Sequence, residues 1–323
     1  MARLRDAPDD LFALTGRASD ELRLPLEFVE KDFWITELLR SVARPIDHAY
    51  VVFKGGTSLS KAYGLIERFS EDVDVLVVVT RAFDKGFGKG SVDRILKAIC
   101  SRAGEDLGVA QEDQSLEGAG KGEHRDVRYS FPTRLKETVV RRGVLLEMGV
   151  RGSPSPNSPR IIRSLISDYA VRALGFPDTE YEEFLPFDVR VLDPTRTLFE
   201  KLAILHHLAS TYPDSATELV RAARHLYDVV KLMTSPTVRA ALAEHPGLAE
   251  ALASDIGAVS QTWGWAHTPR PTGGYAVSPA FNGAAPCREA ISAGWDAIRP
   301  LIYGDVPTLE QCRQAVHEVA QYL

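Results

Sequence analysis

The sequence has few cysteines, no long apolar run and no apolar segment at its start. Its three cysteines, Cys100, Cys287 and Cys312, are widely spaced among 323 residues and form no Cys-x-x-Cys pair. Such usage is typical of a reduced protein with ordinary thiols. The longest apolar run, residues 75–79, is too short to cross a bilayer, and residues 1–11 lack the apolar core of a signal peptide. We therefore expect a cytoplasmic protein without a membrane partner.

An excess of positive charge is also missing. The net charge of −6 at pH 7 argues against a general nucleic-acid coat protein, although it leaves room for a local basic groove. Hydrophobic residues make up 45% of the chain and charged residues 25%, which is the average for globular proteins. At this length, two domains are expected.

The order of expected elements predicts a mixed sheet followed by helices. Apolar residues recur at helical spacing over 24–39, and the valine-rich stretch 72–80 is typical of a buried strand. The glycine-rich stretch 117–122 and the Pro/Ser-rich stretch 152–159 are expected to be loops. From residue 197 onward the periodicity is helical. The fold class is therefore expected to be α+β, with the sheet in residues 1–195, helices in residues 196–323 and the boundary near Pro194. Further strands are expected at 50–53, 125–131, 144–150 and 187–192, and helices at 57–65, 92–103, 198–209, 216–232 and 238–253.

The strongest chemical signal is the stretch KGGTSLSKAYGLIERFSEDVDV, residues 54–75. Asp72 and Asp74 alternate with valines in a strand, so both carboxylates leave the same face of the sheet. Two close carboxylates repel each other unless a cation lies between them. Their oxygens suit Mg²⁺, with Mn²⁺ as an alternative, and Mg²⁺ completes its shell with water and substrate phosphates. The pair therefore indicates nucleoside triphosphate chemistry.

The turn before these acids has features of a phosphate site. Gly55 and Gly56 carry no side chains that would block an anion, and the helix that follows directs free backbone N–H groups towards it. Thr57 and Ser58 offer hydroxyls. A Gly-Gly turn or an Asp-x-Asp pair alone is usually incidental, but their combination in this order favours a nucleotide site. Further along the chain, the residues expected to add to nucleotide binding are Lys61 and Arg68.

These motifs resemble those of a known family. Gly-Gly-Thr-Ser at 55–58, followed by Arg68-x-Ser70-x-Asp72-x-Asp74, is similar to motif I of the AbiEii-type nucleotidyltransferase toxins. This family is a branch of the DNA polymerase β-like superfamily and includes the mycobacterial MenT toxins. The helix around 29–34 (VEKDFW), Glu200-Lys201-Leu202-Ala203 and the stretch 224–229 (RHLYDV) also resemble family motifs, in the family's order.

The resemblance implies a polymerase β-like nucleotidyltransferase domain followed by a helical domain. It also implies that Ser70, Asp72, Lys201 and Asp228 are tied to activity, with Asp74 as a second metal ligand. Polymerase β-like folds add a third carboxylate from a neighbouring strand, and Glu147, an acid within an apolar run, is the best match.

Several of these residues have an ordinary alternative. Glu147 would otherwise pair with Arg128 or Arg151. Lys201 would be a solvated lysine next to Glu200, and Asp228 would form a surface ion pair with Arg224, four residues earlier on one helix face. A set of basic residues could line a path for a phosphate backbone, or form a solvated face instead; they are Arg134, Lys136, Arg141, Arg142, Arg151, Arg160 and Arg163.

The sequence therefore predicts a toxin that transfers a nucleoside monophosphate from an NTP to an acceptor. By resemblance, the acceptor is the 3′ end of tRNA, the effect is a block of translation, and the partner is an antitoxin encoded by a neighbouring gene. Two alternatives stay open. The acceptor could be a small molecule or a protein, or the fold could be a non-catalytic nucleotide-binding module.

Overall fold

The computed structural model describes residues 1–135 and 140–323, which form two compact units. The first unit consists of residues 1–62 and 69–191 and contains the sheet. The second consists of residues 192–323 together with the short segment 63–68, which lies far earlier in the sequence. The predicted boundary at residues 195/196 stays a prediction, but the assignment of segment 63–68 to the second unit is a feature that the sequence pattern did not suggest.

The sheet has seven strands in the order β3-β4-β5-β2-β1-β7-β6. β2 lies at its centre, antiparallel to β1 and parallel to β5. β1 also pairs in parallel with β7, whereas β4 is antiparallel to both β3 and β5. The sheet is therefore mixed and the fold class is α+β, as predicted. The strands are β1 (Ala49–Lys54), β2 (Asp72–Val79), β3 (Gln114–Gly120), β4 (His124–Tyr129), β5 (Val144–Gly149), β6 (Asn157–Ile162) and β7 (Phe187–Leu192).

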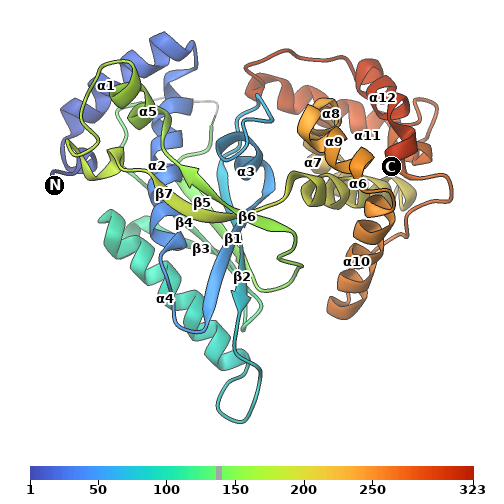
Figure 1. Ribbon diagram of the computed structural model, residues 1–323, viewed down its shortest axis with the longest axis horizontal. Helices are drawn as coiled ribbons and strands as arrows, with labels where there is room; N and C mark the ends of the chain where they lie inside the picture. Colours follow the sequence, from blue (N-terminus) through green and yellow to red (C-terminus); the bar gives the residue numbers. More distant parts are fainter. Residues whose placement is uncertain (136–139) are drawn as a thin grey trace. The chain divides into compact units, whose positions relative to one another are not determined.

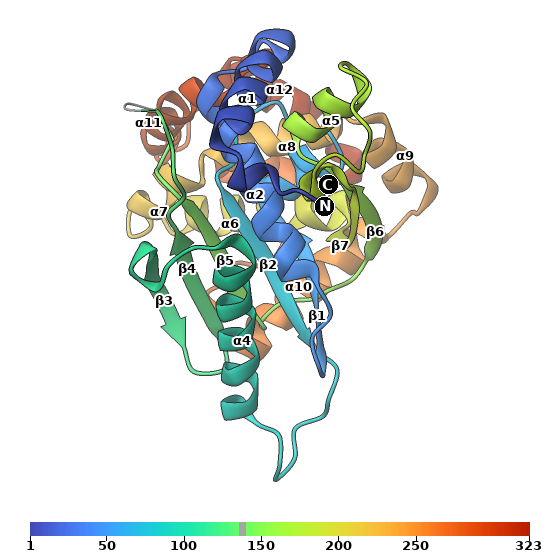
Figure 2. The same ribbon diagram turned by 90° about the vertical axis from the view of Figure 1, so that its left-hand side faces the viewer.

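Helices α2 and α4 cover one face of this sheet (Figures 1 and 2). Val73, Val75 and Val77 of β2 are almost completely buried, which fits alternation in a strand whose apolar face packs on helices. The side chains of Asp72 and Asp74 therefore point to the opposite face. The helices of this unit are α1 (Pro8–Leu22), α2 (Leu26–Ala43), α3 (Gly55–Lys61), α4 (Lys89–Leu107) and α5 (Leu165–Arg172).

The second unit is helical, with α6 at its centre. Asp193 caps α6, because its side chain accepts a hydrogen bond from the backbone N–H of Thr195 at 2.8 Å. α11 approaches α7 so closely that a Cβ at Gly294 would overlap the carbonyl oxygen of Val220. The helices are α6 (Pro194–Ser210), α7 (Ala216–Ala222), α8 (Arg224–Thr234), α9 (Pro236–Glu244), α10 (Leu248–Trp263), α11 (Arg288–Ile298) and α12 (Leu309–Glu318). No helix in the described ranges combines the length and apolarity that crossing a bilayer requires.

Several expected boundaries were wrong. Residues 117–120 of the expected loop 117–122 belong to strand β3, in which Gly118 pairs with Asp126 of β4. Residues 157–159 belong to β6, an edge strand in which Pro159 is tolerated. The helix expected to run through Leu65 ends at Lys61, and the segments 216–232 and 238–253 are each divided between two helices.

Candidate functional site

The acids of β2 lie in a row of charged residues that crosses four strands. Asp74 pairs with Lys54 of β1 on one side and with Glu147 of β5 on the other, and Glu147 pairs in turn with Asp126 of β4. Residues directly opposite one another in a sheet share a face. All four side chains therefore leave the face that is not covered by α2 and α4, and Asp72 joins them two positions before Asp74.

The structure thus places Glu147, the third carboxylate that the resemblance implied, directly beside Asp74 on the neighbouring strand. Glu147 forms no ion pair with Arg128 or Arg151 in the described part of the chain; these arginines pair with Glu117 and Glu123. Lys54 and Asp126 were missed by sequence reasoning. The alternation of buried Val127 and Tyr129 in β4 could have revealed Asp126, because it places Asp126 on the opposite face.

Gly55 sets how closely the turn approaches Asp74. Its φ of +78° lies in the left-handed region that favours glycine, and a Cβ at this position would overlap the Asp74 carboxylate. The backbone of the Gly55-Gly56 turn can therefore lie directly against an acid of the row. A larger residue would displace one or the other.

Negative charge is concentrated at this point of the sheet. Burial, the charge of Asp74 and a hydrogen bond shared with Asp74 raise the pKa of Glu147 to about 8. Burial is also the main cause that raises the pKa of Asp126, and Asp74 adds to it. Close carboxylates in a partly buried place destabilise one another's charged forms. A bound cation would remove this repulsion.

The carboxylate oxygens of these acids are ligands of the kind that Mg²⁺ prefers. Within the described residues, no group of three or more His, Cys, Asp or Glu side chains is already arranged to hold a metal ion. Mg²⁺ needs only one or two protein carboxylates when substrate phosphates and water supply the other oxygens. Asp72 and Asp74, which leave the same face of one strand, meet that requirement, and Glu147 as a third ligand stays a prediction.

The hydroxyls of the turn donate hydrogen bonds within the fold. Thr57 donates its hydroxyl to the carbonyl oxygen of Asp72 at 2.5 Å, and Ser58 donates to that of Gly55 at 2.9 Å. Both side chains are buried. Thr57 therefore connects the turn to the start of β2, and Ser58 stabilises the conformation of the turn. An anion at the turn would be bound by its backbone N–H groups rather than by these hydroxyls.

Two predicted nucleotide-binding cations form ion pairs in the structure. Lys61 pairs with Asp32 of α2 at 2.5 Å, and both side chains are largely buried. Arg68 belongs to the second unit and forms a bidentate pair with Asp228. Ser70 is half-buried, and its hydroxyl has no protein partner among the described residues. Of these three residues, Ser70 alone offers an uncommitted polar group.

The second unit contains a buried cluster of charges. Asp228 of α8, which is completely buried, accepts hydrogen bonds from Arg68 at 2.7 Å through both carboxylate oxygens. Lys201 of α6 lies 2.9 Å from Oδ2 of Asp228 and 3.1 Å from Nδ1 of His225. Both ordinary alternatives were therefore wrong, because Lys201 is buried rather than solvated and the bidentate partner of Asp228 is Arg68 rather than Arg224.

The pKa shifts in the cluster follow from burial and pairing. Burial opposes the charge of Asp228, but Arg68 and Lys201 outweigh it and hold the pKa of Asp228 well below its usual range. Burial lowers the pKa of Lys201, although Asp228 opposes this shift. Burial and the neighbouring Lys201 lower the pKa of His225 to about 3. His225 is therefore neutral at physiological pH, while Asp228 is ionised.

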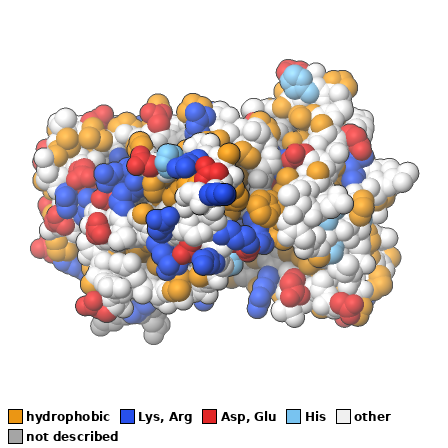
Figure 3. Space-filling view, turned by 90° about the horizontal axis from the view of Figure 1, so that it is seen from below, with side chains coloured by type: hydrophobic (Ala, Val, Ile, Leu, Met, Phe, Trp, Pro, Cys, Tyr) orange, Lys and Arg blue, Asp and Glu red, His pale blue; other side chains and the backbone are white. Residues whose placement is uncertain are grey.

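Several of the basic residues proposed as a path for a phosphate backbone form ion pairs with acids. On the face that Figure 3 shows, Lys and Arg side chains lie in patches that also contain Asp and Glu. Lys136 lies outside the described residues. Arg134 pairs with Asp9, Arg151 with Glu123 and Arg163 with Asp178. The role of these residues in binding a phosphate backbone stays a prediction.

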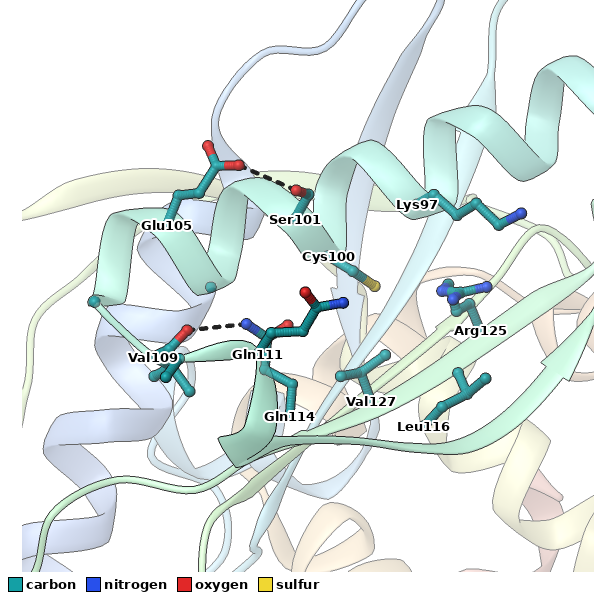
Figure 4. Close-up of a pocket in the computed structure, with 13 residues that line it drawn as sticks. Lys97, Cys100, Ser101, Glu105, Val109, Gln111, Gln114, Leu116, Arg125 and Val127 are labelled. Atoms are coloured by element: carbon teal, nitrogen blue, oxygen red, sulfur yellow. Dashed lines mark hydrogen bonds between the residues drawn. The ribbon is translucent and has the colours of Figure 1, made fainter.

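A cavity of about 600 Å³ lies on the other side of the sheet from the acids (Figure 4). It is lined by residues of α4 and by Arg125 and Val127 of β4. Asp126, between these two residues, points to the face that carries Glu147. The cavity is therefore separate from the row of charged residues.

The chain is similar to two solved structures at low sequence identity. JHP933 from Helicobacter pylori is 16% identical over 88% of each chain, with a TM-score of 0.39. MenT4, a nucleotidyltransferase toxin from Mycobacterium tuberculosis H37Rv, is 20% identical over 96% of each chain, with a TM-score of 0.35. At these TM-scores the likeness says nothing about function, and no curated protein matched the sequence.

The sequence itself matches the family described as "Nucleotidyl transferase AbiEii toxin, Type IV TA system" over residues 37–318. This range contains the Gly-Gly turn, the acids of β2 and β5, and the Lys201–Asp228 cluster. The resemblance seen in the motifs is confirmed, and the chain belongs to the AbiEii family of nucleotidyltransferase toxins of type IV toxin–antitoxin systems.

Proposed function

We propose that this chain transfers a nucleoside monophosphate from an NTP to a hydroxyl of an acceptor, in a reaction that requires Mg²⁺. The observation that carries the proposal is the position of the acids. Asp72 and Asp74 share a face, Glu147 lies directly beside Asp74, and the Gly55 backbone adjoins the Asp74 carboxylate. Family membership supports nucleotidyl transfer as the reaction class, and this arrangement supplies residues suited to it.

The acids would hold the metal, with Asp72 and Asp74 as ligands and Glu147 as the third. Mg²⁺ bound there would act as a Lewis acid, which would neutralise charge on triphosphate oxygens and lower the pKa of the acceptor hydroxyl. The acceptor oxygen forms a bond to the α-phosphorus, the bond to pyrophosphate breaks, and the hydroxyl proton is released. Backbone N–H groups of Gly55 and Gly56 bind phosphate oxygens, and Thr57 and Ser58 hold the turn in shape.

The remaining residues follow from the resemblance to AbiEii-type toxins. Ser70 offers a hydroxyl two residues before Asp72, and Lys201 offers a cation for the phosphates. Asp228 keeps Lys201 charged by accepting a hydrogen bond at 2.9 Å. In this proposal Asp228 acts through Lys201, and Arg68 acts through Asp228.

The proposed acceptor is the 3′ end of tRNA, whose extension blocks translation. This choice rests on the family resemblance, and an antitoxin encoded by a neighbouring gene is the proposed partner. The test is to incubate the purified chain with Mg²⁺, total tRNA and one labelled NTP at a time. Label in tRNA supports the acceptor, and sequencing of the extended ends identifies the nucleotide and the tRNA.

Other outcomes decide between the alternatives. Label in a small molecule or a protein would keep the nucleotidyl transfer and replace the acceptor. Binding of NTP without transfer to any acceptor would leave only a nucleotide-binding module. Replacing Mg²⁺ by Mn²⁺ or removing divalent ions with a chelator measures the metal requirement in the same assay.

The acids can be tested with a matched control on the same sheet. Asp72→Asn and Asp74→Asn should each reduce transfer at least about a hundredfold, because each removes a charge that the metal requires. Asp188→Asn changes an exposed acid of β7 outside the row and should leave transfer unchanged. Full activity in both β2 variants would refute the proposed site.

A further inference from the structure

Lys201 has two polar neighbours from α8, Asp228 and His225, of which only Asp228 is among the site residues predicted from the sequence. Its Nζ lies 2.9 Å from Oδ2 of Asp228 and 3.1 Å from Nδ1 of His225. His225 is mostly buried, with 15% of its side chain exposed. An ammonium group has three N–H donors and no acceptor. Two of the three donors are therefore committed inside the second unit.

The tautomer of His225 follows from this contact. Because the ammonium group can only donate, a hydrogen bond from Lys201 requires Nδ1 to accept and the imidazole proton to be on Nε2. A proton on Nδ1 would instead face Oδ2 of Asp228, which lies 3.9 Å away, beyond hydrogen-bond distance. A protonated imidazole would place a second donor and a second positive charge against Lys201. The low pKa of His225, which results first from burial and then from Lys201, agrees with a neutral ring.

Two fixed contacts also determine the direction of the third donor. The Nζ atom is tetrahedral, and its bond to Cε occupies one direction. The contact with Asp228 opposes rotation about the Cε–Nζ bond, because rotation would break that hydrogen bond. His225 lies where a second N–H group can point, so with both acceptors the same rotational position is favoured twice and the third N–H group keeps one direction.

We propose that His225 is a positioning residue for Lys201, which accepts one of its N–H groups and thereby fixes the direction of the N–H group left for a phosphate oxygen. This inference rests on the role of Lys201 in the proposed function. His225 itself does not touch the substrate. The role requires a neutral hydrogen-bond acceptor at the position of Nδ1. Substitutions can therefore test this acceptor separately from the packing of the imidazole ring.

Three substitutions separate the acceptor from the ring. His225→Asn keeps an oxygen near the place of Nδ1, His225→Gln moves the acceptor one atom further along the side chain, and His225→Leu removes it. We expect His225→Asn to keep most of the activity. His225→Leu and His225→Gln should lower kcat about tenfold, as expected for the loss of one charge-assisted hydrogen bond.

The pH profile distinguishes positioning from packing. An acceptor stabilises the charged form of the amine, so its removal should lower the pKa of Lys201 and shift the alkaline limb of the kcat profile to lower pH. The other charged groups around Lys201 are Asp228 and Arg224 of α8 and Arg68 of segment 63–68. None of them changes in these variants. Side-chain NMR of the Lys201 amine would measure the same shift without any turnover.

The matched control is His206→Leu. His206 is another buried histidine of the second unit, and its Nδ1 lies 3.0 Å from Oγ of Ser278 rather than from a charged group. Its replacement should change stability without moving the pKa of Lys201. If His225→Leu does not fold, the comparison of His225→Asn with His225→Gln tests the same point.

The inference and the proposed function fail in different ways. If Lys201→Met keeps full activity, the role of Lys201 in the reaction is wrong, whatever His225 does. If Lys201→Met is inactive but His225→Leu matches His206→Leu in kcat and in the pKa of Lys201, only the positioning role is overturned. Equal losses in the Asn and Leu variants of His225 would overturn it as well.

Discussion

Replacing Asp228 by alanine should destabilise the second unit by about 3–5 kcal/mol, the usual cost of leaving a buried charge without its partner. Asp228 is completely buried, and it binds Arg68 twice at 2.7 Å and Lys201 at 2.9 Å. The substitution leaves both cations in a place that water hardly reaches. Asp228→Asn should also lose most of the stabilisation, because it keeps the shape of the carboxylate but not its charge.

A second ion pair between the same two segments provides the control. Glu67 is next to Arg68, and Lys231 of α8 is three residues after Asp228; their charged groups lie 2.6 Å apart, with the Glu67 side chain 50% exposed. Exposed pairs contribute about 0–1 kcal/mol. Glu67→Ala should therefore cost far less than Asp228→Ala, although both variants remove one contact between segment 63–68 and α8.

Urea unfolding followed by tryptophan fluorescence suits this comparison, because three of the four tryptophans lie in residues 192–323. The difference between wild type and Asp228→Ala should also depend on pH. Because the folded pKa of Asp228 is depressed, its stabilisation is complete above the unfolded pKa of about 3.9 and is lost as the pH falls through the lower folded value. Equal costs for Asp228→Ala and Glu67→Ala at neutral pH would refute this account.

Three further outcomes are expected. Gly55→Ala should reduce transfer and should lower the free energy of unfolding by more than the roughly 1 kcal/mol that a left-handed backbone costs a residue with a Cβ. In thermal unfolding, Gly64→Ala should show that backbone cost alone, because a Cβ at Gly64 would contact no other atom. Above about pH 8, where Glu147 is ionised, Asp74→Asn should raise the melting temperature in metal-free buffer, because it relieves the repulsion with Glu147; a lower melting temperature at that pH would contradict this. Glu37, whose pKa is raised to about 7 mainly by burial, should make the protein less stable as pH rises from about 4.5 to about 7; Glu37→Gln should remove at most about 3 kcal/mol of this dependence in urea titrations.

The sequence was most informative where neighbours in the chain are also neighbours in the structure. Asp72 and Asp74 share a face because a strand alternates with a period of two, and this holds for any sheet that contains them. The Gly-Gly turn precedes a helix within the same short stretch. Local periodicity therefore identified the strand, the turn and the apolar face of β2 without knowledge of the other strands.

Partners from distant parts of the chain could not be predicted in this way. The partner of Asp228 is Arg68, which is separated from it by 160 residues, and a surface pair with Arg224 was the simplest local choice. Strand β3 was missed for a similar reason. Gly118 reads as a breaker in isolation, but the Asp126 carboxylate of the neighbouring strand occupies the space that a side chain would need.

The placement of residues 63–68 in the second unit affects how the protein can be divided. A fragment that ends before residue 192 would still carry this segment, including Ile66, which is 2% exposed in the complete chain, and the guanidinium of Arg68. Without residues 192–323, Arg68 would lose both oxygens of Asp228. A fragment that begins at residue 192 would lack segment 63–68, so the buried Asp228 would lose Arg68. Neither half should therefore be a good subject for separate expression, because each would lack the contacts between segment 63–68 and residues 192–323.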